Sequence, residues 1–496
     1  MRTERKSGVL LHPTSLPGPG GIGCFGAGAR QFVDFLHHSG QTLWQVLPLG
    51  PTSYGNSPYM SYSAFAGNPL LIDLDRLVAE GDLAARHIRD DFPLDRVDYR
   101  QVDDYKHAAL RAAAAAFFSA GQTARMEEFW HFCDTTPWLH DYALFMALKG
   151  LYLGKGWCDW PKEIVDREPA ALEAASKALG PAIGEQKYQQ WQFYRQWREV
   201  REYANHLGVG IFGDIPIFVS YDSCDVWANQ QLFHLNEAGR PTVVAGVPPD
   251  YFSKTGQLWG NPLYDWGAMA QQGYDWWVQR LRSSLALYDL IRIDHFRGFA
   301  ACWEVPYGEK TAMNGRWVTG PGEAFFSALA DALGELPIVA EDLGVITPDV
   351  EALRDRFSFP GMKILQFAFG SGPQNPYLPH NHVRNCVVYT GTHDNDTTCG
   401  WFSALSAREK KLVLKYLDRS GEEIVWDMIR TALASVADTV VIPLQDLLEL
   451  SGDSRMNLPG TAENNWSWRF RNGALSARLA KRLMGLTEVY GRAPGA

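Results

Sequence analysis

The chain has 496 residues, of which 46% are hydrophobic, and this is enough to bury one or more large cores. Its 46 basic and 56 acidic residues give a net charge of −10. Nucleic acids and anionic membranes attract clustered Lys and Arg, and no long basic run occurs here, so we expect neither as a partner. Nowhere do about 18 apolar residues run uninterrupted, which is the length that a membrane-spanning helix requires.

Seven cysteines are scattered along the chain without any C-x-x-C pair. An odd number of unpaired positions favours buried, free thiols in a reducing compartment over a disulfide framework. The N-terminal residues 1–7 include basic side chains, but the apolar run behind them covers only residues 9–11. That run is too short for a signal peptide, and we therefore expect a cytoplasmic protein.

The chain begins with a strand, a helix and a second strand. Residues 8–11 form a short apolar run, residues 29–38 have helical spacing, and residues 42–49 form another apolar run. Gly40 is typical of the end of a helix. This order of elements is the repeating unit of a parallel sheet.

Residues from about 75 to about 205 have a different character. They are rich in Ala, Arg, Glu and Asp, and the apolar positions recur about every 3.6 residues over 103–120 and 186–207. This pattern predicts a largely helical insertion subdomain after the second strand. Its Trp residues are interpreted as the core of that subdomain.

The strand pattern then resumes and continues almost to the end of the chain. Helical segments such as 322–333 and 407–417 lie in the gaps between apolar runs. The further runs of strand character cover residues 209–216, 289–294, 336–340, 362–369, 385–389 and 439–444. Eight strands with helical returns predict an α/β fold, a (β/α)8 TIM barrel that forms a single catalytic domain over residues 1–496.

Three of these apolar runs are followed by an acidic residue. Asp294 ends one run, Glu341 follows the next, and Asp394 comes shortly after the run at 385–389. In a barrel of parallel strands, the carboxyl ends of the strands lie on one face, where active sites form. We therefore expect these three side chains to converge on one pocket.

Pairs of carboxyl groups in different protonation states carry out glycosidic bond cleavage. One is ionised and attacks or stabilises the anomeric carbon, while the other is protonated and releases the leaving oxygen. Arg292 lies two positions before Asp294 on the same strand face, and its positive charge favours the ionised form of Asp294. Glu341 follows the apolar residues 338–340, which favour a protonated carboxyl. Asp294 is therefore the better nucleophile and Glu341 the better acid.

Four segments of the chain resemble the conserved regions of the amylomaltases. These are the 4-α-glucanotransferases, or disproportionating enzymes, of glycoside hydrolase family 77 in the α-amylase clan. The segments are 213–219, 291–298, 340–344 and 391–395. Further similar stretches are 11–18, 47–68, 248–262 and 455–461, so the similarity runs from about residue 8 to about residue 470.

The resemblance implies roles for the acidic residues and their neighbours. Asp294 would be the nucleophile, Glu341 the general acid/base, and Asp394 the residue that binds sugar hydroxyls and stabilises the transition state. His393 and Arg292 would contact the glucosyl ring at the cleavage site. A fourth carboxylate, Asp214 in the run 209–216, would lie close behind them.

Transfer to a second sugar requires that water be excluded while the acceptor is bound. The loop at residues 245–265 carries aromatic side chains, including Tyr251 and Trp259, that can lie across a sugar face. The resemblance makes this segment an aromatic lid loop. Tyr59 and Asn465, in two other stretches, are expected as further sugar contacts.

The mechanism implied is a retaining double displacement through a covalent glucosyl-Asp294. The expected partners are maltooligosaccharides or other α-1,4-glucans. Two alternatives stay open at this point: a retaining α-glucan hydrolase built on the same carboxylates, and a non-catalytic glucan-binding protein, against which the presence of all three carboxylates argues. No metal and no cofactor are expected. The pattern G-x-G-x-x-G at 21–26 fits a dinucleotide fingerprint, but residues 41–53 contain no acid to hold a ribose.

Overall fold

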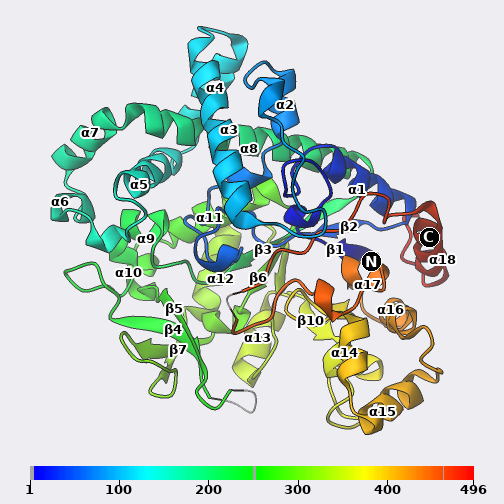
Figure 1. Cartoon of the computed structure of the whole chain (residues 1–496). Helices are drawn as coiled ribbons and strands as arrows, with labels where there is room; N and C mark the ends of the chain where they lie inside the picture. The colour runs from blue at the N-terminus through cyan, green and yellow to red at the C-terminus, as the bar shows by residue number, and fades with distance from the viewer. Residues whose placement is uncertain (1–4, 250–252, 462, 496) are drawn as a thin grey trace.

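A parallel sheet of eight strands forms the centre of the molecule (Figure 1). The computed structural model describes residues 5–249, 253–461 and 463–495. The order across the sheet is β10-β11-β12-β1-β2-β3-β6-β9. The strands are β1 (Lys6–Leu10), β2 (Leu43–Gln45), β3 (Gly210–Pro216), β6 (Leu290–Asp294), β9 (Ile338–Ala340), β10 (Gly361–Ile364), β11 (Cys386–Tyr389) and β12 (Thr439–Pro443).

The sheet curls into a nearly closed barrel. The two edge strands are β9 and β10, and the N–H of Ala340, at the end of β9, donates to the carbonyl of Pro360, just before β10, at 2.9 Å. All eight predicted strands are present, and the prediction of a (β/α)8 barrel is confirmed. The run 362–369 is shorter than predicted as a strand, because β10 ends at Ile364 and a 3-10 turn (Leu365–Phe367) follows.

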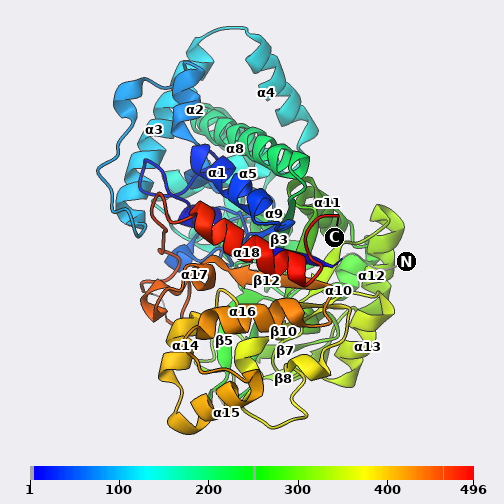
Figure 2. The ribbon, with the colours of Figure 1, turned by 90° about the vertical axis from the view of Figure 1, so that its right-hand side faces the viewer.

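Helices cover the outside of the barrel. The bounds of α12 (Gly322–Leu333) and α15 (Ala407–Leu417) are those predicted from the sequence. Figure 2 shows α1 (Ala27–His38, blue) and α18 (Ala477–Val489, red) side by side. The others on this layer and its loops are α9 (Cys224–Ala228), α10 (Trp266–Gln271), α11 (Asp275–Leu287), α13 (Pro348–Arg356), α14 (Thr398–Ala404), α16 (Ile424–Ala434) and α17 (Leu444–Leu447). Across the described ranges, a helix both long and apolar enough to cross a membrane does not occur.

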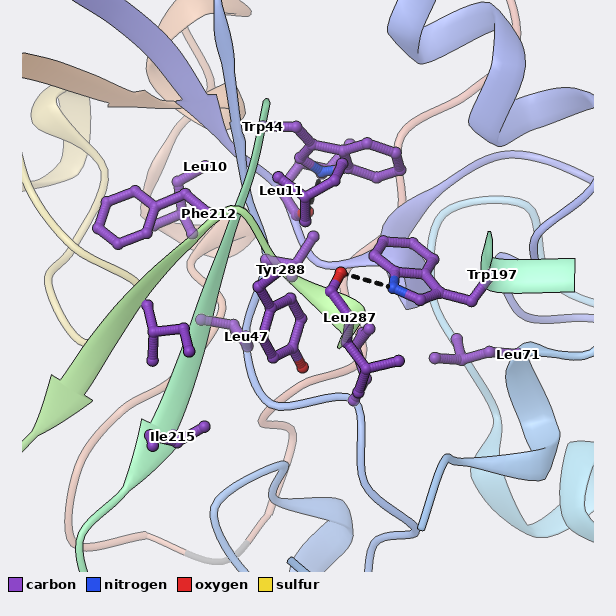
Figure 3. Close-up of a cluster of buried hydrophobic side chains, with 14 of the residues drawn as sticks. Leu10, Leu11, Trp44, Leu47, Leu71, Trp197, Phe212, Ile215, Leu287 and Tyr288 are labelled. Atoms are coloured by element: carbon purple, nitrogen blue, oxygen red, sulfur yellow. Dashed lines mark hydrogen bonds between the residues drawn. The ribbon is translucent and has the colours of Figure 1, made fainter. Parts of the chain in front are cut away.

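Between β2 and β3, the chain forms a group of helices that extends from one side of the barrel (Figure 1). They are α2 (Leu74–Ala79), α3 (Tyr99–Ser119), α4 (Ala124–Thr135), α5 (Leu139–Leu151), α6 (Lys162–Val165), α7 (Pro169–Ala178) and α8 (Gly180–His206). The long helix α8 packs against other helices of this group and also against helices that cover the barrel. The Nε1 of Trp197 on α8 donates to the carbonyl of Leu287 at 3.0 Å, and the indole lies edge-on to Trp44 of β2 (Figure 3). The core under the helices is therefore continuous with the core of the barrel, and a separate subdomain at 75–205 stays a prediction.

A second, antiparallel sheet, which was not predicted from the sequence, lies beside the barrel. Its strands, in the order β5-β4-β7-β8, are β4 (Val243–Val247), β5 (Gln257–Pro262), β7 (Ala301–Pro306) and β8 (Arg316–Thr319). The segment 245–265, interpreted as a loop, thus contains the end of β4 and all of β5. β5 is largely exposed and includes both Gly and Pro, so it lacks the apolar signal that marks a buried strand. β4 does have an apolar run, Val243–Val247, but its end falls in the segment interpreted as a loop.

Candidate active site

The predicted carboxylates lie at the carboxyl ends of neighbouring barrel strands. Asp294 is the last residue of β6, Glu341 follows β9 directly, and Asp214 lies near the end of β3. Asp394 lies in the loop after β11, on the same face of the barrel. This is the face on which barrel enzymes carry their active sites.

Arg292 connects two of the carboxylates. Its Nη1 donates to Oδ2 of Asp214 at 2.6 Å, and its Nη2 donates to Oδ1 of Asp294 at 2.7 Å. The side chains of Arg292 and Asp214 are almost fully buried. A buried charge needs partners of opposite sign, so this arrangement fixes the guanidinium between two carboxylates and orients Asp294.

Tyr59 joins this network from the loop after β2. Its hydroxyl donates to Oδ2 of Asp214 at 2.7 Å and lies 2.9 Å from Nε2 of His393. The rings of Tyr59 and His393 stack with centroids 5.2 Å apart, and Trp466 lies beside both. The predicted residues Tyr59, Asp214, Arg292 and His393 are therefore one connected group, whereas Trp466 was not among the predicted site residues.

Glu341 is buried and held by backbone amides. Its Oε2 accepts a hydrogen bond from the N–H of His295 at 2.7 Å, and its Oε1 accepts one from the N–H of Leu343 at 3.0 Å. Burial and the charge of Asp294 raise the pKa of Glu341 to about 8, although Arg292 and the two amides act in the opposite direction. Glu341 therefore carries its proton at neutral pH.

Asp394 has a more open environment, with 46% of its side chain exposed. The Nδ2 of Asn457 donates to its Oδ1 at 2.7 Å, and Arg455 donates to its backbone carbonyl at 2.9 Å. Neither partner was predicted, although both belong to the stretch 455–461 that resembles the family. The only signal for them in the sequence was that two polar residues, Arg455 and Asn457, lie in a stretch without strand or helix spacing.

Asn465 lies in the same C-terminal loop. Its Oδ1 accepts from the N–H of Leu458 at 2.9 Å, and its Nδ2 donates to the carbonyl of Thr461 at 2.8 Å. The side chain thus holds its own loop together. Its role as a sugar contact stays a prediction.

The second sheet reaches the site through Trp259 of β5. Its indole, on β5, lies edge-on to the ring of His295 with centroids 4.7 Å apart. His295 directly follows Asp294, so the predicted aromatic residue packs against the chain neighbour of the predicted nucleophile. The other aromatic residue predicted in this segment, Tyr251, lies outside the described residues.

The arrangement combines the groups that acid-assisted displacement at an acetal carbon requires. Asp294 offers a carboxylate paired with a guanidinium, and Glu341 offers a protonated carboxyl beside it. Asp394 adds a third, more accessible carboxylate. Two neighbouring carboxyl groups in different protonation states can attack a sugar and protonate its leaving group.

Comparison with known proteins agrees with this chemistry. A family model described as 4-alpha-glucanotransferase matches residues 11–476. A 4-alpha-glucanotransferase of Synechocystis sp. is 53% identical over 499 residues, covering 99% of both chains, and one of Thermus thermophilus is 50% identical over 501 residues, covering 99% of this chain and 100% of the relative. A solved structure, the amylomaltase from Streptococcus agalactiae in complex with acarbose, is 41% identical with a TM-score of 0.96 and covers 99% of this chain and 100% of that one.

Proposed function

The chain belongs to the 4-alpha-glucanotransferase family, which confirms the resemblance found in its sequence, and we propose how its own residues perform the transfer. A segment of an α-1,4-glucan passes from one maltooligosaccharide to the 4-hydroxyl of another, or to glucose. Asp294, Glu341 and Asp394 carry the chemistry. The observation that supports this most directly is the burial of Glu341, which raises its pKa to about 8, beside the Asp294–Arg292 ion pair.

In the first step, a carboxylate oxygen of Asp294 attacks the anomeric carbon. The bond from that carbon to the bridging oxygen breaks, and Glu341 gives its proton to this oxygen as the leaving chain departs. The pKa of about 8 keeps the proton available at neutral pH. The products are a free glucan end and a glucosyl-Asp294 beside an ionised Glu341.

In the second step, the 4-hydroxyl of an acceptor glucan attacks the same carbon. Its proton passes to Glu341, the bond to Asp294 breaks, and the starting state of both carboxyl groups returns. Two inversions at one carbon retain the α-configuration. Glu341 thus alternates between acid and base without any other proton donor.

The remaining residues stabilise charge and bind sugar. The transition state carries positive charge on the glucosyl ring, and Asp394, held by Asn457, opposes this charge and binds ring hydroxyls. Arg292 keeps Asp294 oriented for attack. It also stabilises the negative charge that returns to Asp294 when the bond to the sugar breaks. Trp259, at the edge of the second sheet, is suited to bind the acceptor and to keep water from the intermediate.

A reducing, cytoplasmic setting is part of the proposal. All seven cysteines are free thiols, and several are buried. This pattern is typical of proteins that work where disulfides do not form. The expected partners are neutral glucans, in line with the acidic balance of the chain.

Incubation with maltotriose alone tests the function. We expect glucose together with maltopentaose and longer chains, while the total number of reducing ends stays constant. Asp294→Ala should abolish turnover and leave maltodextrin binding largely intact, as measured by calorimetry. Rising reducing ends without longer chains would instead mean hydrolysis, and full turnover by Asp294→Ala would remove this residue from the nucleophile role.

A further inference from the structure

His295, between the nucleophile and the next turn, has an unusual backbone conformation. Its φ of 54° and ψ of 48° lie in the left-handed region. This region is unfavourable for a residue that has a Cβ, so the surrounding structure must hold it there. Strained residues of this kind gather at functional sites.

The left-handed turn brings successive amides to one residue. The N–H of His295 donates to Oε2 of Glu341 at 2.7 Å, and the N–H of Phe296 donates to the backbone carbonyl of Glu341 at 3.2 Å. The N–H of Glu341 donates in turn to the carbonyl of Ile293 at 3.1 Å. Residues 293–296 therefore form hydrogen bonds with both the backbone and the side chain of Glu341. Among them, the amide of His295 is the group that binds the carboxyl.

The side chain of His295 is held by packing. The rings of His295 and Trp259 lie edge-on, with their centroids 4.7 Å apart and an angle of 81° between their planes. The ring of Phe218, which follows β3, has its centroid 6.4 Å from that of His295. Within the described residues, the ring makes no hydrogen bond to the protein. Burial lowers the pKa of His295 to about 4, against the charge of Asp294, so the ring is neutral at the pH of catalysis.

We propose that His295 is a positioning residue that links Trp259 of β5 to the protonation of Glu341. The indole holds the imidazole, the imidazole holds the left-handed turn, and the turn presents its amide to the carboxyl. The inference rests on the proposed role of Glu341 as acid and base. Through this link, the residue expected to cover the acceptor also adjusts the group that activates it.

The direction of the effect follows from the hydrogen bond. A donor to a carboxylate stabilises the ionised form, which is the form that takes the proton of the acceptor hydroxyl. When the His295 amide moves away, the pKa of Glu341 rises further and a larger fraction of the intermediate carries a protonated Glu341. The other groups that face this carboxyl are Asp294, Arg292 and the phenol of Tyr377, and neither substitution removes any of them.

A double-mutant cycle on the pH profile tests the link. The variants are Trp259→Ala, His295→Asn and the double variant, with Trp130→Ala on α4 as a matched control for loss of an exposed indole. Asn tolerates the left-handed region, so His295→Asn removes the ring with little backbone strain. For each variant, kcat/KM for maltotriose is measured as a function of pH. The profile gives the pH of the basic limb, where Glu341 loses the proton that it needs for the first step.

We expect the basic limb of each single variant to move to higher pH by about one unit, as for a carboxylate that loses one hydrogen bond. The double variant should move no further, because both changes break the same chain of contacts. Trp130→Ala should leave the limb in place. Limbs that do not move in the single variants, or shifts that add in the double variant, would overturn the link.

Two further variants separate this inference from the proposed function. His295→Val should shift the limb most, because a β-branched residue resists the left-handed region. Thermal unfolding reports whether it folds, and the cycle above stands without it. Glu341→Gln should abolish turnover in an otherwise native chain; if turnover and its basic limb survive in that variant, the role of Glu341 fails, and this result is distinct from a failure of the link.

Discussion

At the scale of single residues, the site depends on one buried guanidinium. Arg292 is 4% exposed and Asp214 is fully buried, so neither charge can be solvated if the other is removed. In the proposed mechanism, Asp294, at the far end of the same group, is the partner that must remain free to react. Asp214 would then allow Arg292 to stay charged throughout that reaction, including the interval when Asp294 is bonded to sugar.

Replacing Asp214 by Asn should be strongly destabilising. It leaves Arg292 with Asp294 as its remaining carboxylate partner, and we expect the free energy of unfolding to fall by about 3 kcal/mol. Urea unfolding followed by tryptophan fluorescence measures this. As a control, Asp91→Asn removes one member of an exposed pair with Arg89 and should leave the midpoint nearly unchanged. Equal effects of the two changes would contradict the argument.

Glu341 should make stability depend on pH. Its pKa is about 8 in the folded chain and about 4.3 in an unfolded one, so the folded state holds a proton that the unfolded state releases between these values. Its contribution is fully present below about pH 4 and is lost as pH rises toward 8. Glu341→Gln stays neutral and should gain on the wild type by about 1.4 kcal/mol for each pH unit crossed. Unfolding curves at pH 4.5 and 8 give the difference, and a pH-independent difference would refute the assigned pKa.

At the scale of elements, the site joins barrel strands to loops that lie far apart in the chain. Asp394 follows β11, but its hydrogen bond comes from Asn457 in the loop after α17. Trp259 comes from β5 in the second sheet and meets His295 at the end of β6. The strands fix the carboxylates, and these additional segments adjust them.

Asn457→Ala should impair catalysis without unfolding the chain. The loss of a hydrogen bond to a carboxylate corresponds to roughly a tenfold to hundredfold fall in kcat/KM. Thr461→Ala, in the same loop, removes a hydroxyl that donates to the carbonyl of Leu458 and accepts from Asn465, and serves as the matched control for a general loosening of the loop. If both variants lose activity equally, Asn457 acts through the loop and not through Asp394.

This division also explains what the sequence could predict. Buried parallel strands are nearly continuous apolar runs, so the eight barrel strands and the carboxylates at their ends could be identified directly. The strand β5 could not, since it is largely exposed and includes Gly and Pro. The strand β4 is an apolar run, and its end was assigned to the expected lid loop. Asn457 and the amide of His295 act through contacts between distant segments, which leave no periodic pattern. For Tyr59, the sequence indicated the place in the site, and the structure added that its hydroxyl is engaged by Asp214 and His393.

At the scale of the whole molecule, α8 makes the added helices and the barrel one packed body. Trp197 of α8 is fully buried against the barrel side, where it donates to the carbonyl of Leu287 at 3.0 Å (Figure 3) and its ring centroid lies 4.9 Å from that of Phe25. Trp191 of the same helix packs against Phe117 of α3, so α8 couples the stabilities of the two parts. The insertion should therefore unfold together with the barrel.

Trp197→Ala should lower the free energy of unfolding by about 4 kcal/mol, because it leaves a large cavity and an unpaired carbonyl. The unfolding should stay a single transition by fluorescence and by circular dichroism. Trp130→Ala, in which an exposed indole of the same group of helices is removed, should have little effect. Two separate transitions in the wild type would show that residues 75–205 fold as an independent unit.

The sheet order has a further consequence for how the protein is made. β1 lies between β12 and β2, and Lys6 is paired with Thr439, so β1 leaves the ribosome long before one of its two partners. At about 5–20 residues per second, this partner arrives on the order of half a minute later. Until then, the nascent chain carries an apolar strand with an open edge, which is a docking place for other unfinished chains. The time for which this edge stays open during synthesis is thus set by the arrival of the strand that closes the ring.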